Sequence, residues 1–198
     1  MSTPDYRAGV EPVMRLLRGG LSHQENHSMS NESGSVILRV GFEHVVEHIR
    51  NGRVIDVETV HNLVPTEGLN HILNVALRAN SPTANWYVAL FEGNYTPVAG
   101  LTAATFPSSA TECTAYDESN RVLWVSAAAS GGIVTNSANK ATFTMNATKT
   151  VYGIVMSSLL TKGGTTGVLV SAARFASSKS VYDDDLLQVT SSITMTSS

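Results

Sequence analysis

Extended and helical patterns of apolar residues alternate along the first half of the chain. Residues 35–40 and 42–50 have an extended pattern, and residues 53–64 return after Asn51-Gly52. Asn-Gly is the pair best suited to a two-residue hairpin turn, because both central residues of that turn need a positive φ. The pattern therefore predicts a hairpin over residues 42–64, which Pro65 ends.

The segment after Pro65 has helical spacing instead. Its apolar residues fall at positions 69, 72, 73, 76 and 77, which predicts a helix over residues 66–79. Thr66 is expected to cap the N-terminus of this helix, and Glu67 suits the positive end of its dipole.

From Trp86 onward, short apolar segments are separated by Gly, Asn and Asp. Evenly spaced segments of this kind predict an antiparallel sandwich or jelly-roll-like domain. The chain would then be mainly β, with one short helix, a β domain over residues 36–198 and its sandwich over residues 86–195. The expected strands are 86–93, 121–130, 132–137, 140–146, 150–158, 167–175 and 185–195. The segment 150–158 is apolar almost throughout, which predicts a central strand.

Residues 1–35 have the pattern of an extended N-terminal arm. A short amphipathic helix is expected at Glu11–Arg18, before Gly19-Gly20. The polar residues 21–35 cannot bury enough apolar surface to offset their ordering entropy. Two interpretations stay open, a free tail and a tail that docks on a neighbouring subunit. In the second, the partner-binding residues are Val13, Met14, Leu16 and Leu17.

The hairpin contains an arrangement of charges that needs an explanation. Pairing outward from the turn sets Ile49 against Val54 and Glu47 against Asp56, and like charges directly opposite cost energy. We interpret the acids as a strip on one exposed or partner-facing side that meets Lys or Arg of a partner, with calcium binding as an alternative. The strip consists of Glu43, Glu47, Asp56 and Glu58, and the other side carries His44, His48 and Val57.

Composition excludes several classes of function. The net charge is −3, the pI is about 6.0 and the chain has no basic block, so binding to nucleic acid is not expected. No apolar run approaches the ~20 residues of a membrane span, and the first 20 residues lack the apolar segment of a secretory signal. Cys113 is the only cysteine, so an intrachain disulfide is excluded.

Catalytic and metal-binding patterns are weak. The chain has no G-x-S-x-G elbow, and its histidines all precede residue 72. His44 and His48 share a face, with His61 if the register holds, but they are at least about 7 Å apart along the strand. Asp183-Asp184-Asp185 lacks the ligand spacing of a calcium loop and is interpreted as a solvated turn. We therefore expect no enzyme activity, no cofactor and no metal.

The aromatic residues allow two interpretations. At alternating strand positions they are more often core residues than a sugar-binding platform, which leaves a carbohydrate-binding module as a minor alternative. The aromatic set is Trp86, Tyr87, Phe91, Tyr95, Tyr116 and Trp124.

Four stretches over residues 55–195 resemble structural proteins of tailed bacteriophages. The shared pattern consists of NLV-x-x-x-GL-x-x-IL, W-x-x-x-LF-x-x-N-Y-x-P, Y-x-E-x-x-R and L-x-V-T-x-x-I. Members of that family often have a Gly-Asp turn before the last strand, where this chain has Tyr182-Asp183-Asp184-Asp185. The arm lies largely outside the likeness.

The resemblance implies a non-enzymatic protein of the virion, assembled in the host cytoplasm. Its expected role is capsid decoration or cement, bound to the shell of the major capsid protein, and a homo-oligomer is expected. A minor tail, baseplate or adaptor protein is the alternative.

Overall fold

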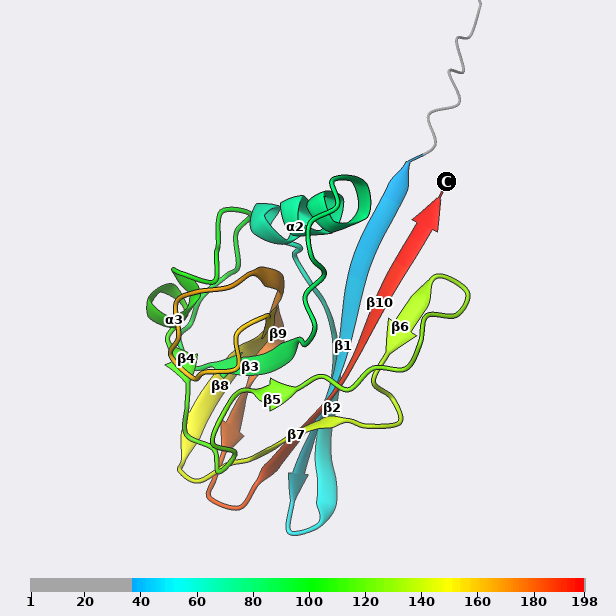
Figure 1. The fold of residues 1–198 in the computed structure, drawn as a ribbon. Coiled ribbons are helices and arrows are strands. Elements are labelled where there is room, and N and C mark those ends of the chain that lie inside the picture. Colours follow the sequence, from blue (N-terminus) through cyan, green and yellow to red (C-terminus); the bar gives the residue numbers. More distant parts are fainter. Residues whose placement is uncertain (1–36, 198) are drawn as a thin grey trace, which may run out of the picture. The chain divides into compact units, whose positions relative to one another are not determined.

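Two antiparallel sheets make up the body of the computed structural model, which describes residues 37–197 (Figure 1). The mainly β, sandwich-like prediction is confirmed. Sheet A consists of β1 (Leu38–Arg50), β2 (Arg53–His61), β6 (Ile133–Thr135), β7 (Ala141–Thr144) and β10 (Leu186–Ser197). Sheet B consists of β3 (Tyr87–Phe91), β4 (Glu112–Cys113), β5 (Val122–Leu123), β8 (Lys149–Ser157) and β9 (Leu169–Val181). The helices are α2 (Thr66–Leu77) and α3 (Phe106–Ser109).

The first and last strands of the described chain lie side by side at the centre of sheet A. β1 pairs with β10 from Leu38↔Ser197 to Ile49↔Leu186, β2 lies outside β1, and β6 and β7 both pair with β10. In sheet B, β8 lies between β3 and β9, so the prediction of a central strand is confirmed. An isolated bridge from Leu63 to Ala172 links the chain after β2 to β9.

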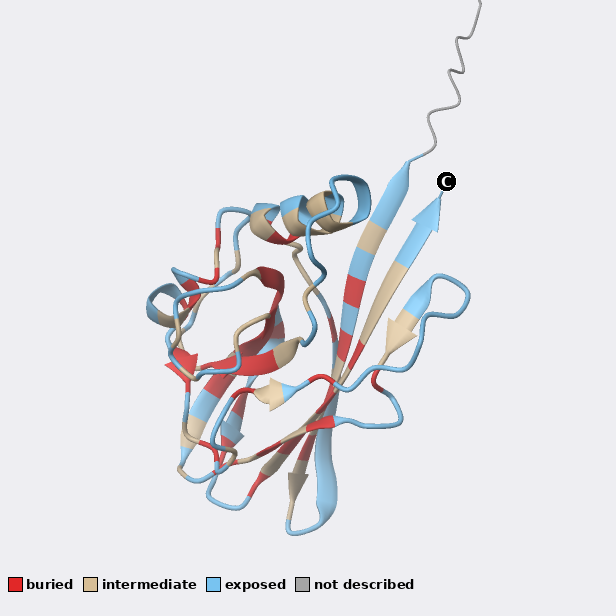
Figure 2. Ribbon diagram, in the orientation of Figure 1, coloured by how far each residue is buried: buried red, intermediate tan, exposed pale blue. Residues whose placement is uncertain are grey.

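The two sheets differ in how many of their faces are covered. One core cluster fills the space between them and includes Val46, Phe143, Ile154 and Leu187. A second cluster on the other side of sheet B includes Phe91 of β3 and Phe106 of α3. Sheet B is therefore buried on both faces through β3, the later part of β8 and the first part of β9, which are mostly red in Figure 2. The outer side chains of sheet A are of intermediate or full exposure.

Helix α2 was predicted correctly as an element, but its details differ. Pro65 is the N-cap residue, and no side chain caps the helix, so the predicted Thr66 cap is wrong. Glu67 does lie in the first turn, where its Oε2 accepts hydrogen bonds from the backbone N–H groups of Ala103 (2.9 Å) and Leu169 (2.7 Å). This carboxylate therefore ties α2 to β9 and to the loop before α3. None of the described helices is long and apolar enough to cross a membrane.

Candidate functional site

A β-bulge in the hairpin changes which residues face the core. Asn51 and Gly52 have φ values of 51° and 71°, so the predicted turn is confirmed, and Ile49 pairs with Val54. The register then shifts between His48 and Ile49, so that His48 lies opposite Asp56 and Glu47 opposite Val57. The predicted pair of Glu47 with Asp56 is wrong, because one extra residue in β2 reverses the alternation of every side chain beyond it.

The four acids of the predicted strip therefore lie on two faces of sheet A. Residues directly opposite in an antiparallel pair share a face, so Asp56 and Glu58 lie with His48 and Val46 on the inner face. Glu43 and Glu47 lie on the outer face with Val57. The expectation that all four share one side, opposite Val57, is corrected.

The two inner acids bind a lysine from the other sheet. Lys179 of β9 contacts Asp56 Oδ2 at 2.5 Å and also contacts Glu58 Oε2 through its Nζ. Its side chain is 4% exposed, against 45% for Asp56 and 14% for Glu58. The second oxygen of Glu58 accepts a hydrogen bond from the backbone N–H of Ala176. The acids face a cation of the same chain, which removes the repulsion inferred from the sequence.

The outer acids belong to a surface that we call the open face. It is the outward side of sheet A, and its side chains are of intermediate or full exposure. Glu47 forms an ion pair with Lys140 at 2.6 Å, whereas Glu43 lies opposite His61. The register places on this face Glu43, Val45, Glu47, Ile49, Val54, Val57, Thr59, His61, Leu186, Gln188, Thr190 and Ser192.

The histidines of the hairpin do not form a shared metal site. His44 is fully buried, with Nδ1 2.7 Å from the Ser191 hydroxyl and Nε2 2.8 Å from the Ser171 hydroxyl. Burial lowers the pKa of His44 to about 3. His48 shares its face, but His61 lies on the open face, against expectation. Among residues 37–197, no group of three or more His, Cys, Asp or Glu side chains could hold a metal ion.

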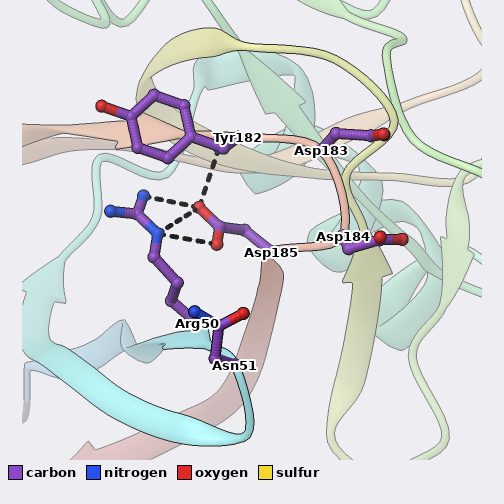
Figure 3. Close-up of a pocket in the computed structure, with 6 residues that line it drawn as sticks. All are labelled: Arg50, Asn51, Tyr182, Asp183, Asp184 and Asp185. Carbon is purple, nitrogen blue, oxygen red and sulfur yellow. Dashed lines mark hydrogen bonds and ion pairs between the residues drawn. The ribbon is translucent and has the colours of Figure 1, made fainter.

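Asp185 is the centre of a second polar cluster at the end of the hairpin (Figure 3). It accepts three hydrogen bonds from Arg50, one from the backbone of Tyr182 and one from His48 Nε2 at 2.9 Å. Burial opposes its charge, but the bonds from Arg50 and His48 outweigh burial and hold the pKa of Asp185 well below its usual range. Asp183 and Asp184 are exposed as predicted, whereas Asp185 is buried, so the prediction of a wholly solvated turn is wrong there.

The six residues of Figure 3 line a shallow pocket around this cluster. Arg50 lies beneath the ring of Tyr182, with its guanidinium carbon 4.1 Å from the ring centroid. Its hydrogen bonds to Asp185 and to the backbone oxygen of Ser180 connect the hairpin to the β9–β10 turn. Arg50 and Asp185 therefore satisfy each other and fix the β9–β10 turn, while Asp183 and Asp184 are the exposed carboxylates of this pocket.

A buried ion pair of sheet B was not identified in the sequence. Arg121 donates two hydrogen bonds to Glu112, at 2.8 and 2.7 Å, with both side chains almost fully buried. Arg121 also donates to the backbone oxygens of Leu159 and Gly164 and so fixes the loop between β8 and β9. The two charges are nine residues apart, in the loop-rich stretch before and after Cys113, and no periodic pattern marks them.

The remaining sequence candidates have structural roles where they are described. Cys113 is fully buried, and burial raises the pKa of its thiol. Phe91, Tyr116 and Trp124 are buried, which confirms the core interpretation for these aromatics. The arm residues Val13, Met14, Leu16 and Leu17 lie outside the described residues.

Comparisons with known proteins give no further guide to the site. No protein-family model matches the chain, and a search of curated proteins finds no match either.

Proposed function

We propose that the protein is a non-enzymatic structural component of a tailed-bacteriophage particle, bound to the outside of the capsid shell as a decoration or cement protein. The observation that carries the proposal is the unequal covering of the two sheets. Sheet B has a core cluster on each face, and sheet A leaves its open face without one. A sheet face with exposed apolar residues is suited to contact with another protein.

The open face combines exposed apolar side chains with a few charged ones. Val54 and Val57 expose 53% and 55% of their area, and Val45, Ile49 and Leu186 add partly exposed apolar area beside them. Threonines and a single ion pair surround them. Such a face can bury apolar area against a shell protein, and Glu43 and Glu47 can be matched by basic groups on that partner.

The polar groups inside the domain support a structural role. Asp185, Glu112 and His44 are each hydrogen-bonded to named partners of the same chain. These groups hold turns and strands in place. The resemblance of residues 55–195 to phage structural proteins adds the expectation that this structural role is in a phage particle.

Location and copy number in purified particles test the proposal. Mild denaturant should strip the protein from intact capsids, and mass spectrometry should find it in the released fraction in many copies that follow the shell symmetry. A small number of copies that fractionate with tails would favour the minor tail or baseplate alternative. Absence from particles would refute both.

A further inference from the structure

The contact between Lys179 and the acids of β2 brings three reactive groups together. An amine from the edge of sheet B meets two carboxylates from the edge of sheet A, and β2 and β9 are not paired with each other at these residues. The Phe175 ring lies 5.5 Å from Nζ. A lysine buried to this extent beside a carboxyl group is chemically distinct from a surface ion pair, because its surroundings exclude most water.

We propose that Lys179 and Asp56 form an intramolecular isopeptide bond, with Glu58 as the proton relay. The reaction converts one ammonium and one carboxylate into an amide and a water molecule. A C–N bond forms between Nζ and Cγ of Asp56, and the bond from Cγ to one carboxyl oxygen breaks. That oxygen leaves as water with two of the three ammonium protons, so no oxidant or other reactant is required.

The two acids have different surroundings, and these assign their roles. Glu58 is held at Oε1 by the backbone N–H of Ala176, which leaves Oε2 directed at Nζ. A fixed carboxylate in contact with the amine is suited to carry protons. Asp56 is the more exposed acid, so its carboxyl carbon has room to become tetrahedral and the departing water has a path to solvent.

The ionised state of the cluster is the starting point of this reaction. Burial would lower the pKa of Lys179, but hydrogen bonds and charges from Asp56 and Glu58 outweigh it and raise that pKa. The hydrogen bond from Lys179 lowers the pKa of Asp56. The amine becomes nucleophilic when one proton moves through Glu58 to Asp56, a transfer that leaves the net charge of the cluster unchanged.

The bond would join two strand edges that side-chain contacts otherwise hold together. Residues 56 and 179 are 123 positions apart, so the cross-link would close a long loop through most of sheet B. Closing a long loop lowers the entropy of the unfolded chain and so favours the folded state. This inference concerns the domain itself and does not depend on the proposed function.

Intact mass spectrometry of the full-length protein tests the proposal. The measured mass should be about 18 Da below the mass calculated from the sequence, because one water is lost. Trypsin should then fail to cleave after Lys179, so residues 54–78 and 175–198 should appear as one branched peptide. An unmodified mass overturns the proposal. A water loss confined to residues 54–78 also overturns it, because that result is a cyclised aspartate.

Variants assign the three roles. Lys179→Arg keeps the positive charge without a reactive amine and should have the full calculated mass. Asp56→Asn should still cross-link, with loss of ammonia, about 17 Da, in place of water. Glu58→Gln should leave most of the protein unlinked, and complete linkage in this variant would overturn the role of Glu58.

The chain contains a matched control for proximity alone. Lys140 and Glu47 are 2.6 Å apart, but the pair is more exposed than Lys179, at 36% and 24%, and has one acid. No branched peptide should join these two residues. An equal yield of linkage at this pair would show that closeness is sufficient and would refute the need for the buried three-group site.

Discussion

His44 shows how a polar side chain is accommodated between the two sheets. Both ring nitrogens have serine hydroxyls as partners, so the neutral ring is satisfied and a protonated ring would be buried as a charge. The ring lies on the inner face between Phe42 and Val46, which are also buried. Its hydrogen bonds to Ser191 of β10 and Ser171 of β9 connect the two sheets through the core.

This environment predicts a pH dependence of stability. The folded pKa of His44 is about 3, below its ordinary value of 6.5, so the unfolded chain binds the proton first as pH falls. Stability attributable to His44 is complete above pH 6.5 and should fall by up to about 1.4 kcal/mol per pH unit below it. Urea unfolding at pH 7.5, 6 and 5 measures this slope. His44→Gln should be less stable at pH 7.5 but have a shallower slope, and equal slopes would contradict the prediction.

The Arg121–Glu112 pair predicts a large cost for removing one partner. Arg121→Met leaves Glu112 charged and almost fully buried, which should reduce the free energy of unfolding by about 3–5 kcal/mol. The double variant Arg121→Met, Glu112→Gln should recover part of that loss, since no unpaired charge remains. Chemical denaturation of the three proteins measures both effects, and a single variant as stable as the double would argue against a buried pair.

At the scale of elements, helix α2 packs through its smallest residue. A Cβ at Gly68 would lie 2.8 Å from the Val170 Cα and 2.9 Å from the Leu169 backbone oxygen. The leucines of α2 point away from this contact, with Leu73 and Leu77 53% and 77% exposed. The close approach of helix and strand therefore depends on the absence of a side chain at position 68.

Gly68→Ala should separate α2 from β9 and lower stability by about 1–3 kcal/mol, despite the better helix propensity of alanine. Gly100→Ala is the control, because a Cβ there meets nothing within 4 Å. Thermal unfolding should show a lower midpoint for the first variant and little change for the second. An unchanged midpoint for Gly68→Ala would mean that α2 can shift without cost.

Local signals in the sequence predicted elements better than faces and long-range partners. Asn51-Gly52 identified the turn, and the short segment 140–146 identified the strand β7, in which Ala141 and Phe143 are buried. The bulge in β2, where Ile55 has no partner between the His48–Asp56 and Ile49–Val54 pairs, was not predictable. One extra residue leaves an alternating pattern that fits either register. The helical spacing of apolar residues predicted α2, but the residue that packs closest to β9 is Gly68, which has no side chain to signal burial.

The residues of the candidate site could not be paired from the sequence, because their partners are distant along the chain. Lys179 is separated from Asp56 by 123 residues, and no local pattern connects them. Asp185 looked like part of a solvated acidic run, but its partners Arg50 and His48 come from β1, more than 130 residues earlier in the sequence. Once the register is known, Asp56 and Glu58 lie on the inner face of sheet A, where Lys179 pairs with both, and Glu43 and Glu47 lie on the open face. The partner-facing candidates among the four acids are therefore Glu43 and Glu47.

At the scale of the whole molecule, the open face is the surface expected to meet the particle. Glu47→Lys places a second lysine beside Lys140 and reverses the charge at position 47. Rebinding to stripped particles should weaken, while the unfolding midpoint should change little because the side chain is on the surface. Asp183→Lys makes the same charge change on the exposed β9–β10 turn, and rebinding should be retained. Equal rebinding of both variants and the natural protein would exclude the open face.

The arm provides a second, independent test of attachment to the particle. If the apolar residues of Glu11–Arg18 dock on a neighbouring subunit, they act at a high effective concentration, because the tether links them to an already bound domain. The double variant Leu16→Ser, Leu17→Ser should therefore weaken rebinding to stripped particles severalfold without lowering the unfolding midpoint of the β domain. Leu21→Ser, in the polar part of the arm, removes a leucine outside the proposed docking segment and should rebind normally. If both variants rebind like the natural protein, attachment depends on the β domain, and the interpretation of the arm as a free tail is favoured.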